Sequence, residues 1–423
     1  MSVLTLLPIV FRSLLNRRVT AFLTVLSIAI SVTLFLGVEK IRAGAQAGFA
    51  STVSDTDLIV GARSGAINLL LYSVFRIGDA TNNVTWDTYQ QIAARPDVAW
   101  AIPISLGDSH RGYRVVGTTS AYFEHYRTGD RLPLAMEAGQ PFENLFEAVI
   151  GADVAEALSY TIGQEVIIAH GIGAVSFASH DNLPFRVVGI LKRTGTPVDR
   201  SVHVSLAAIE AIHEGWGGGA APRGRDRLSA SEVEALDLEP QSITAFLLGL
   251  KSRIAVLRAQ REINAYRQEP LLAIIPGVAL TQLWDVVSVA ETALSGIAAF
   301  VILTGLFGLM TNILTSLNER RREMAILRSV GASALHVFVL LVSEAVLLAA
   351  AGAVLGLVLV QLVIFVAAPL VVEATGVHIG QAGVTFFDLK TMGGVILLGG
   401  ILAALPAWRA YRQSLADGLT VRL

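Results

Sequence analysis

Four long apolar stretches constrain what this chain can fold into more than any other feature. A helix that crosses a bilayer needs roughly 20 mostly apolar residues. Stretches of that kind predict membrane spans at 19–42, 288–317, 333–369 and 390–409. The interval 43–287, between the first and second spans, contains short strand and helix patterns instead. We therefore predict an α-helical membrane protein with four transmembrane helices and a large α+β domain inserted between the first two.

The distribution of Lys and Arg predicts which segments are cytoplasmic. Short flanking segments rich in these residues stay on the inner side of the membrane. They occur before span one, between spans two and three, and after span four, as Arg12, Arg17, Arg18, Arg320, Arg321, Arg322, Arg328, Arg409, Arg412 and Arg422. The loop 370–389 has no Lys or Arg from Glu373 to Asp388. We expect both termini, the tail 410–423 and the segment 318–332 inside, and 43–287 to be extracytoplasmic.

The composition and the absent motifs exclude several functions. The formal net charge of −2 gives no electrostatic support for binding nucleic acid. The chain has no cysteine, which excludes disulfides and thiol chemistry. It has no G-x-x-x-x-G-K-[ST] phosphate loop and no Gly-Lys pair at all. We predict no catalytic residue and no cofactor in this chain, which is therefore not expected to be an enzyme.

The predicted outside domain mixes both kinds of secondary structure. Alternating or apolar runs predict strands at 113–116, 165–169, 185–190 and 243–250, and helices are expected at 87–94 and 252–267. The segment 149–158 is expected to be the end of a strand that leads into a helix. The order of these elements predicts two lobes, the second covering about 145–210. Six glycines and prolines open the segment 215–240, which predicts a flexible loop.

Histidines are concentrated in the same domain. They are His110, His125, His170, His180, His203 and His213. None stands at a recognised metal-ligand spacing. We predict scattered structural or surface histidines and no metal ligand. Convergence of two or three of them on a metal is the alternative.

Two features inside the spans predict packing or buried polarity. Glu344 is the acid inside the apolar pattern of span three, where a carboxylate normally has a partner or a function. A structural role is favoured, such as pairing with an Arg near the interface. Gly352 and Gly356 form a small-xxx-small pair that lets helices approach closely. Contact within the bundle and contact across a dimer both remain open.

The cytoplasmic segment 318–332 has the most specific pattern. Its charged start is followed by Met324, Leu327 and Val330 at three-residue spacing, and Gly331 ends the run. This pattern predicts a short amphipathic docking helix. A second amphipathic helix is predicted at 1–18, where it would contact membrane lipid. The alternative is a plain extension of span one. Pro8 is unfavourable in the middle of the predicted helix.

The sequence NERRREMAILRSVGAS at 318–333 resembles the coupling helix of the MacB/LolC/FtsX-type ABC transporter permeases. The matching positions are Arg320, Glu323, Met324, Ala325, Leu327, Arg328, Gly331 and Ala332. The N-terminal helix, AVIGADVAEALSYTIGQEVII, FRVVGILKRTGTPVDRSVHVSL, the Glu344–Gly352–Gly356 spacing and the tail LPAWRAYRQSLADGL resemble further elements in the family's order. Ser414 and Leu415 stand near a Pro expected by the family pattern.

The resemblance implies a bacterial inner-membrane permease without a fused ATPase. It would work as a homo- or heterodimer with a cytoplasmic ABC ATPase that carries the ATP and Mg. The residues that would couple to it are Arg320, Arg321, Glu323, Met324, Leu327, Arg328 and Gly331. ATPase motion would reach the periplasmic domain and export or extract a lipoprotein, peptide or small amphiphile, with a periplasmic adaptor or lipoprotein as a further partner. The alternatives are a non-transporting regulator of a cell-wall hydrolase and a metal-handling envelope complex.

Overall fold

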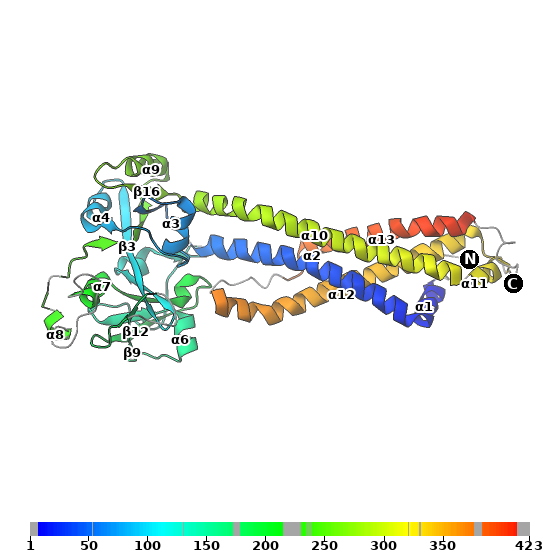
Figure 1. Cartoon of the computed structure of the whole chain (residues 1–423), viewed down its shortest axis with the longest axis horizontal. Helices are drawn as coiled ribbons and strands as arrows, with labels where there is room; N and C mark the ends of the chain where they lie inside the picture. Colours follow the sequence, from blue (N-terminus) through cyan, green and yellow to red (C-terminus); the bar gives the residue numbers. More distant parts are fainter. Residues whose placement is uncertain are drawn as a thin grey trace. The chain divides into compact units, whose positions relative to one another are not determined.

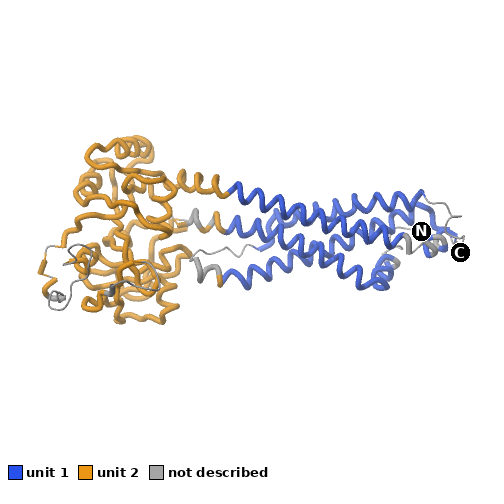
Figure 2. The backbone as a smooth tube through the Cα atoms, in the orientation of Figure 1, with its two compact units in different colours: residues 1–44, 288–369, 381–423 blue, residues 45–287, 370–380 orange. Residues whose placement is uncertain are grey.

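The computed structural model divides the chain into two compact units (Figure 2). It describes residues 7–52, 54–129, 131–171, 178–214, 230–233, 235–236, 238–319, 321–329, 331–375 and 383–412. Unit 1 comprises 1–44, 288–369 and 381–423, and unit 2 comprises 45–287 and 370–380. The second unit is therefore inserted after the first long helix, as the sequence predicts.

Unit 1 is a helix bundle (Figure 1). Among the described residues, four helices are long and apolar enough to cross a membrane. They belong to α2 (Arg18–Thr52), α10 (Pro276–Glu319), α12 (Ala334–Thr375) and α13 (Phe386–Arg412). The prediction of four membrane helices is thus confirmed. The helices extend beyond the predicted spans, because helical hydrogen bonding continues where the apolar composition ends.

The short helix α1 (Leu7–Asn16) precedes α2 and is separated from it by a turn at Arg17. Residues 7–16 are therefore not a plain extension of span one. Pro8 is the second residue of α1, where a missing backbone N–H breaks no helical bond. Val10 of α1 is fully buried and clusters with Leu340 of α12, whereas Phe11 is exposed. This one-sided burial agrees with the amphipathic pattern.

Glycines bring α12 close to α2. A Cβ added at Gly352 would lie 2.7 Å from Ile28 Cβ. One added at Gly356 would lie 2.8 Å from the Ala29 carbonyl oxygen, which is backbone and has little freedom to move. Thr33 also donates a hydrogen bond to the Gly356 carbonyl across this contact (3.1 Å). The structure thus assigns the pair to packing inside one bundle.

Unit 2 contains a mixed sheet with the strand order β16-β1-β15-β3-β4-β13-β8-β12-β7, and β9, β10 and β11 attach beside this path. Two separate pairs, β2 with β14 and β5 with β6, lie outside this sheet. The first strands are β1 (Leu58–Ala62), β2 (Val84–Thr85), β3 (Val98–His110), β4 (Tyr113–Thr118), β5 (Arg127–Thr128), β6 (Leu132–Pro133), β7 (Met136–Gly139) and β8 (Glu147–Ile150). The remainder are β9 (Glu165–Val166), β10 (Ala169–His170), β11 (Ala178–Ser179), β12 (Phe185–Leu191), β13 (Ser201–Ser205), β14 (Ser242–Ile243), β15 (Ala245–Leu250) and β16 (Leu271–Ile274).

Short helices flank this sheet: α3 (Ala66–Ser73), α4 (Trp86–Ala93), α5 (Ala121–His125), α6 (Ala152–Leu158), α7 (Leu206–His213), α8 (Ala230–Val233) and α9 (Val256–Asn264). Two 3-10 turns lie at Pro197–Arg200 and Arg253–Ala255. Local signals explain several starts. Thr85 caps α4 by accepting a hydrogen bond from the Thr88 N–H, and Ser205 caps α7 in the same way from Ala208.

The two predicted lobes share one sheet through β3. This strand pairs with β15 along its first half and with β4 along its second half. One buried hydrophobic cluster contains residues between Val115 and Val233. Another contains residues of β1, β15 and β16. The predicted loop 215–240 lies largely outside the described residues, apart from α8 and a few neighbours.

Candidate functional site

The candidate coupling helix is α11 (Arg321–Ser329), nine residues between α10 and α12. Glu323 lies in its first turn and Arg328 in its last, the favourable ends for these charges. The helix ends before Gly331, whose N–H donates to the Arg328 carbonyl at 3.1 Å. Gly331 has φ +102°, a conformation that side chains disfavour, so glycine serves the turn into α12.

The side chains of α11 point in different directions. Met324 is buried and belongs to the same apolar cluster as Leu317, Val337, Leu341 and Ala407 of the long helices. Glu323, Ile326 and Ser329 are exposed. One side of α11 therefore packs against the bundle, and the other side is exposed.

Not every predicted coupling residue can be placed. Arg320 lies outside the described residues, and only the backbone helix is described at Arg321 and Leu327. Arg328 is half-buried at the end of the helix. The coupling role of Arg320, Arg321, Glu323, Met324, Leu327, Arg328 and Gly331 stays a prediction. Ile326 is the exposed apolar residue that the three-residue spacing did not select.

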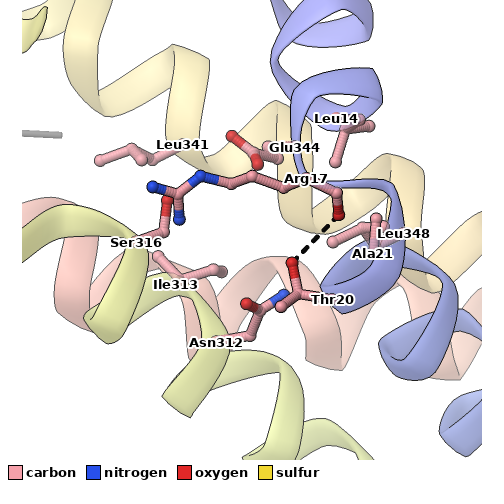
Figure 3. Close-up of a pocket in the computed structure, with 10 residues that line it drawn as sticks. All are labelled: Leu14, Arg17, Thr20, Ala21, Asn312, Ile313, Ser316, Leu341, Glu344 and Leu348. Carbon is pink, nitrogen blue, oxygen red and sulfur yellow. Dashed lines mark hydrogen bonds between the residues drawn. The ribbon is translucent and has the colours of Figure 1, made fainter. Parts of the chain in front are cut away.

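Glu344 lies in a small polar pocket inside unit 1 (Figure 3). Arg17, Thr20, Asn312 and Ser316 also line it, from the α1–α2 turn, α2 and α10. Figure 3 shows the Arg17 and Glu344 side chains beside each other, with Thr20 donating to the Arg17 carbonyl at 3.0 Å. This placement agrees with the predicted structural role beside an Arg. The pocket holds about 10 Å³, roughly the space of one water molecule.

A buried ion pair joins two other parts of unit 1. The Nζ of Lys40 on α2 lies 2.9 Å from Oδ2 of Asp388 on α13, and the two side chains are 6% and 1% exposed. Lys40 also donates to the Gly383 carbonyl at 3.3 Å. Asp388 accepts from the Thr385 N–H at 2.9 Å and so caps α13. Sequence reasoning missed this pair because it placed Lys40 in the first span and Asp388 in the loop 370–389, and no local pattern links two segments so far apart.

Three of the six histidines in the segment 43–287 have structural roles. His110 contacts the Ile167 carbonyl and the Tyr160 hydroxyl, and His125 stacks on Trp100 with centroids 5.5 Å apart. His203 is fully buried against Tyr122. Burial lowers the pKa of His203 to about 3, helped by the positive charge of Arg76. These three match the prediction of structural or surface histidines.

The prediction of scattered histidines is wrong for the other three. His170, His180 and His213 converge with Asp108, and one ligand atom from each lies within 4.8 Å of the others. Burial opposes ionisation of Asp108, but hydrogen bonds from His170 and His213 outweigh it and lower its pKa to about 2. Burial likewise opposes protonation of His213, yet Asp108 raises its pKa overall. No local spacing signals this cluster, because β3, β10, the segment after β11 and α7 supply one residue each.

Two family models match the sequence. One describes a MacB-like periplasmic core domain and covers residues 21–266, and the other describes an FtsX-like permease C-terminal region and covers 295–415. The first alone covers more than half of the chain. The chain belongs to the MacB/FtsX-type ABC transporter permeases. The predicted family is therefore confirmed, together with its four membrane helices and inserted mixed domain.

Relatives of known name agree with this assignment. The permease is 27% identical over 421 residues to the macrolide export ATP-binding/permease protein MacB of Nitrobacter winogradskyi, covering 97% of this chain and 59% of that protein. It is 22% identical over 367 residues to the protein of the same name from Bdellovibrio bacteriovorus, covering 82% and 52%. The chain thus spans little more than half the length of these relatives.

Two solved structures match about half of the chain with low scores. The periplasmic region of MacB from Actinobacillus actinomycetemcomitans matches 55% of this chain and 94% of its own at 9% identity, with a TM-score of 0.35. The extracellular domain of the noncanonic ABC-type transporter YknZ from Gram-positive bacteria matches 52% and 99% at 14% identity, with a TM-score of 0.30.

Proposed function

We propose that this permease transmits ATPase-driven motion from α11 to the inserted domain, which then exports or extracts a lipoprotein, peptide or small amphiphile. The ATPase is a separate cytoplasmic ABC subunit that carries ATP and Mg, and two permease subunits form the working dimer. The chain resides in a bacterial inner membrane with both termini cytoplasmic and unit 2 in the periplasm. The Lys and Arg distribution supports this orientation.

The observation that carries the proposal is the two-sided character of α11. Met324 packs into the core cluster of the long helices, while Glu323 and Ile326 are exposed. A force applied to the exposed side would reach the helices through a close-packed contact rather than through a loop. Packed interiors transmit displacement because they have low compressibility.

The bundle also favours work outside the membrane over passage through it. The stretches 19–38, 292–317, 345–372 and 391–408 contain no charged residue. The polar pocket at Glu344 has space for about one water molecule. A polar cargo would need a larger and more hydrophilic route.

Charge reversal on α11 tests the proposal. The double variant Glu323→Lys with Arg328→Glu should lose ATPase binding and stimulation of ATP hydrolysis while the permease stays folded. The matched control is Glu137→Lys with Arg267→Glu, two exposed charges of unit 2, which should behave like the unchanged protein. Normal ATPase recovery and normal stimulation in the α11 variant would rule out the coupling assignment.

Co-purification of the intact complex from its host tests the cargo and the partners. An adaptor or a lipoprotein recovered with the permease and an ATPase would support export or extraction. Recovery of a cell-wall hydrolase instead would replace that part of the proposal with regulation of the hydrolase.

A further inference from the structure

Four side chains that are far apart in the sequence form one compact cluster in unit 2. Asp108 lies near the end of β3, His170 ends β10, His180 follows β11, and His213 ends α7. We propose that these residues bind one divalent transition-metal ion of the zinc class. The proposal concerns unit 2 alone and does not rest on coupling to an ATPase.

The distances suit a tetrahedral site. His170 Nδ1 lies 2.9 Å from Asp108 Oδ1, His213 Nε2 lies 3.0 Å from His170 Nδ1, and His213 Nε2 lies 3.5 Å from Asp108 Oδ1. Around a zinc ion with bonds of about 2.0–2.1 Å, neighbouring ligand atoms are roughly 3.3 Å apart. These three atoms already form a triangle of that size. His180 supplies the fourth atom, within 4.8 Å of the rest.

The backbone holds the ligands in place independently of a metal. His170 is the cross-strand partner of Asp108, so their side chains are neighbours. The register of β3 shifts between Leu106 and Ser109, a bulge that changes the direction of the side chain at Asp108. The His180 N–H donates to the Ile168 carbonyl at 2.9 Å, which fixes the start of the chain after β11.

The hydrogen bonding of His213 indicates that Nε2 is the nitrogen that would bind the metal. Its Nδ1 lies 2.7 Å from the Ile209 carbonyl, an acceptor, so Nδ1 carries the proton. In the neutral ring Nε2 then has a lone pair for a metal ion bound on the side of Asp108 and His170. Histidines that bind metals characteristically donate their other N–H to a carbonyl in this way.

The charge balance also favours a cation. Asp108 has a side chain only 2% exposed, and a buried carboxylate requires a positive partner. Three imidazoles and one carboxylate are typical zinc ligands, and imidazole also suits other late transition metals. Four protein ligands leave no open position, so the ion would have a structural role. It would fasten the β10–β11 pair to β3 and α7.

Cobalt binding to the full-length permease tests the site. The protein is purified in detergent through a tag without histidine, and Co²⁺ is titrated while visible absorption is recorded. We expect one Co²⁺ per chain with the intense bands of a tetrahedral complex, and displacement by Zn²⁺. His170→Ala should weaken binding by about 100-fold or more, since even loss of an outer hydrogen bond costs about 10–100-fold.

The matched control is His125→Ala, because both histidines are on unit 2 and have exposed side chains, 47% for His170 and 37% for His125. The control should bind Co²⁺ like the unchanged protein. Because His170 is exposed, we expect its variant to stay folded, and circular dichroism of both variants verifies this. The proposal is overturned if the unchanged protein gives no tetrahedral spectrum, or if His170→Ala keeps its affinity.

Discussion

The membrane bundle and the inserted domain are packed with different kinds of side chains. The largest fully buried residues of unit 2 are aromatic, including Tyr122, Phe185 and Phe246. In unit 1, Phe300 and Phe365 are exposed, and Gly352 and Gly356 lie at the close contact with α2. Water drives large apolar groups inside, whereas lipid is as apolar as a protein core. Close approach and polar contacts therefore stabilise the bundle.

The largest predicted effect concerns the buried pair of unit 1. Lys40→Met leaves Asp388 buried without its cation and should destabilise the bundle by roughly 3–5 kcal/mol. Adding Asp388→Leu to it should restore much of that loss, because two apolar side chains can replace a buried pair. Thermal unfolding of the permease in detergent measures both.

Arg42→Met is the control for that pair. Arg42 pairs with Glu39 on the same helix, and these side chains are 34% and 24% exposed. Such a pair should contribute at most about 1 kcal/mol. If Lys40→Met were no more destabilising than Arg42→Met, the buried Lys40–Asp388 pair would contribute no more to stability than the partly exposed pair, and the prediction would be wrong.

A smaller effect is expected from adding one methyl group at the helix contact. Gly356→Ala should cost about 1–3 kcal/mol, because its Cβ would meet the Ala29 carbonyl oxygen. Gly308→Ala is the control, since a Cβ there would have no heavy atom within 4 Å. Melting of the two variants under identical conditions compares them. Equal stability would contradict packing of α12 on α2 through Gly356.

The smallest predicted effect is a pH dependence of the stability of unit 2. The pKa of His203 in the folded protein is about 3, well below the ordinary histidine value of 6.5. As the pH falls, His203 therefore takes up a proton in the unfolded chain before it does so in the folded protein. The free energy of unfolding then decreases from about pH 6.5 downward. Between pH 7 and pH 5.5 this amounts to about 1.3 kcal/mol.

His203→Phe removes this titration and keeps an aromatic ring beside Tyr122. The variant should lose less stability than the unchanged protein over that pH interval, while both share the contribution of every other group. Hydrogen exchange on β4, β8 and β13 at the two pH values measures the difference. An identical pH dependence in the two proteins would mean that His203 is not buried in its neutral form.

Local patterns predict much of this fold. The strand and helix patterns of 43–287 reappear as β4, β12, β15, α4, α6 and α9, with Thr85 as a cap. The glycine after 318–330 ends α11 as expected, because a positive φ favours that residue. Such features depend on neighbours within a few positions, and the sequence displays those neighbours directly.

Contacts between distant segments could not be predicted from such local patterns. The sequence by itself determined the four membrane helices, the inserted domain and the short helix between α10 and α12. Only the tertiary structure decided that Gly356 meets α2, that Met324 faces the bundle and that Lys40 reaches Asp388. The same holds for Asp108, His170, His180 and His213. Hydrophobic length and periodicity are local properties, whereas these contacts depend on which helix faces and strand ends the folded chain brings together.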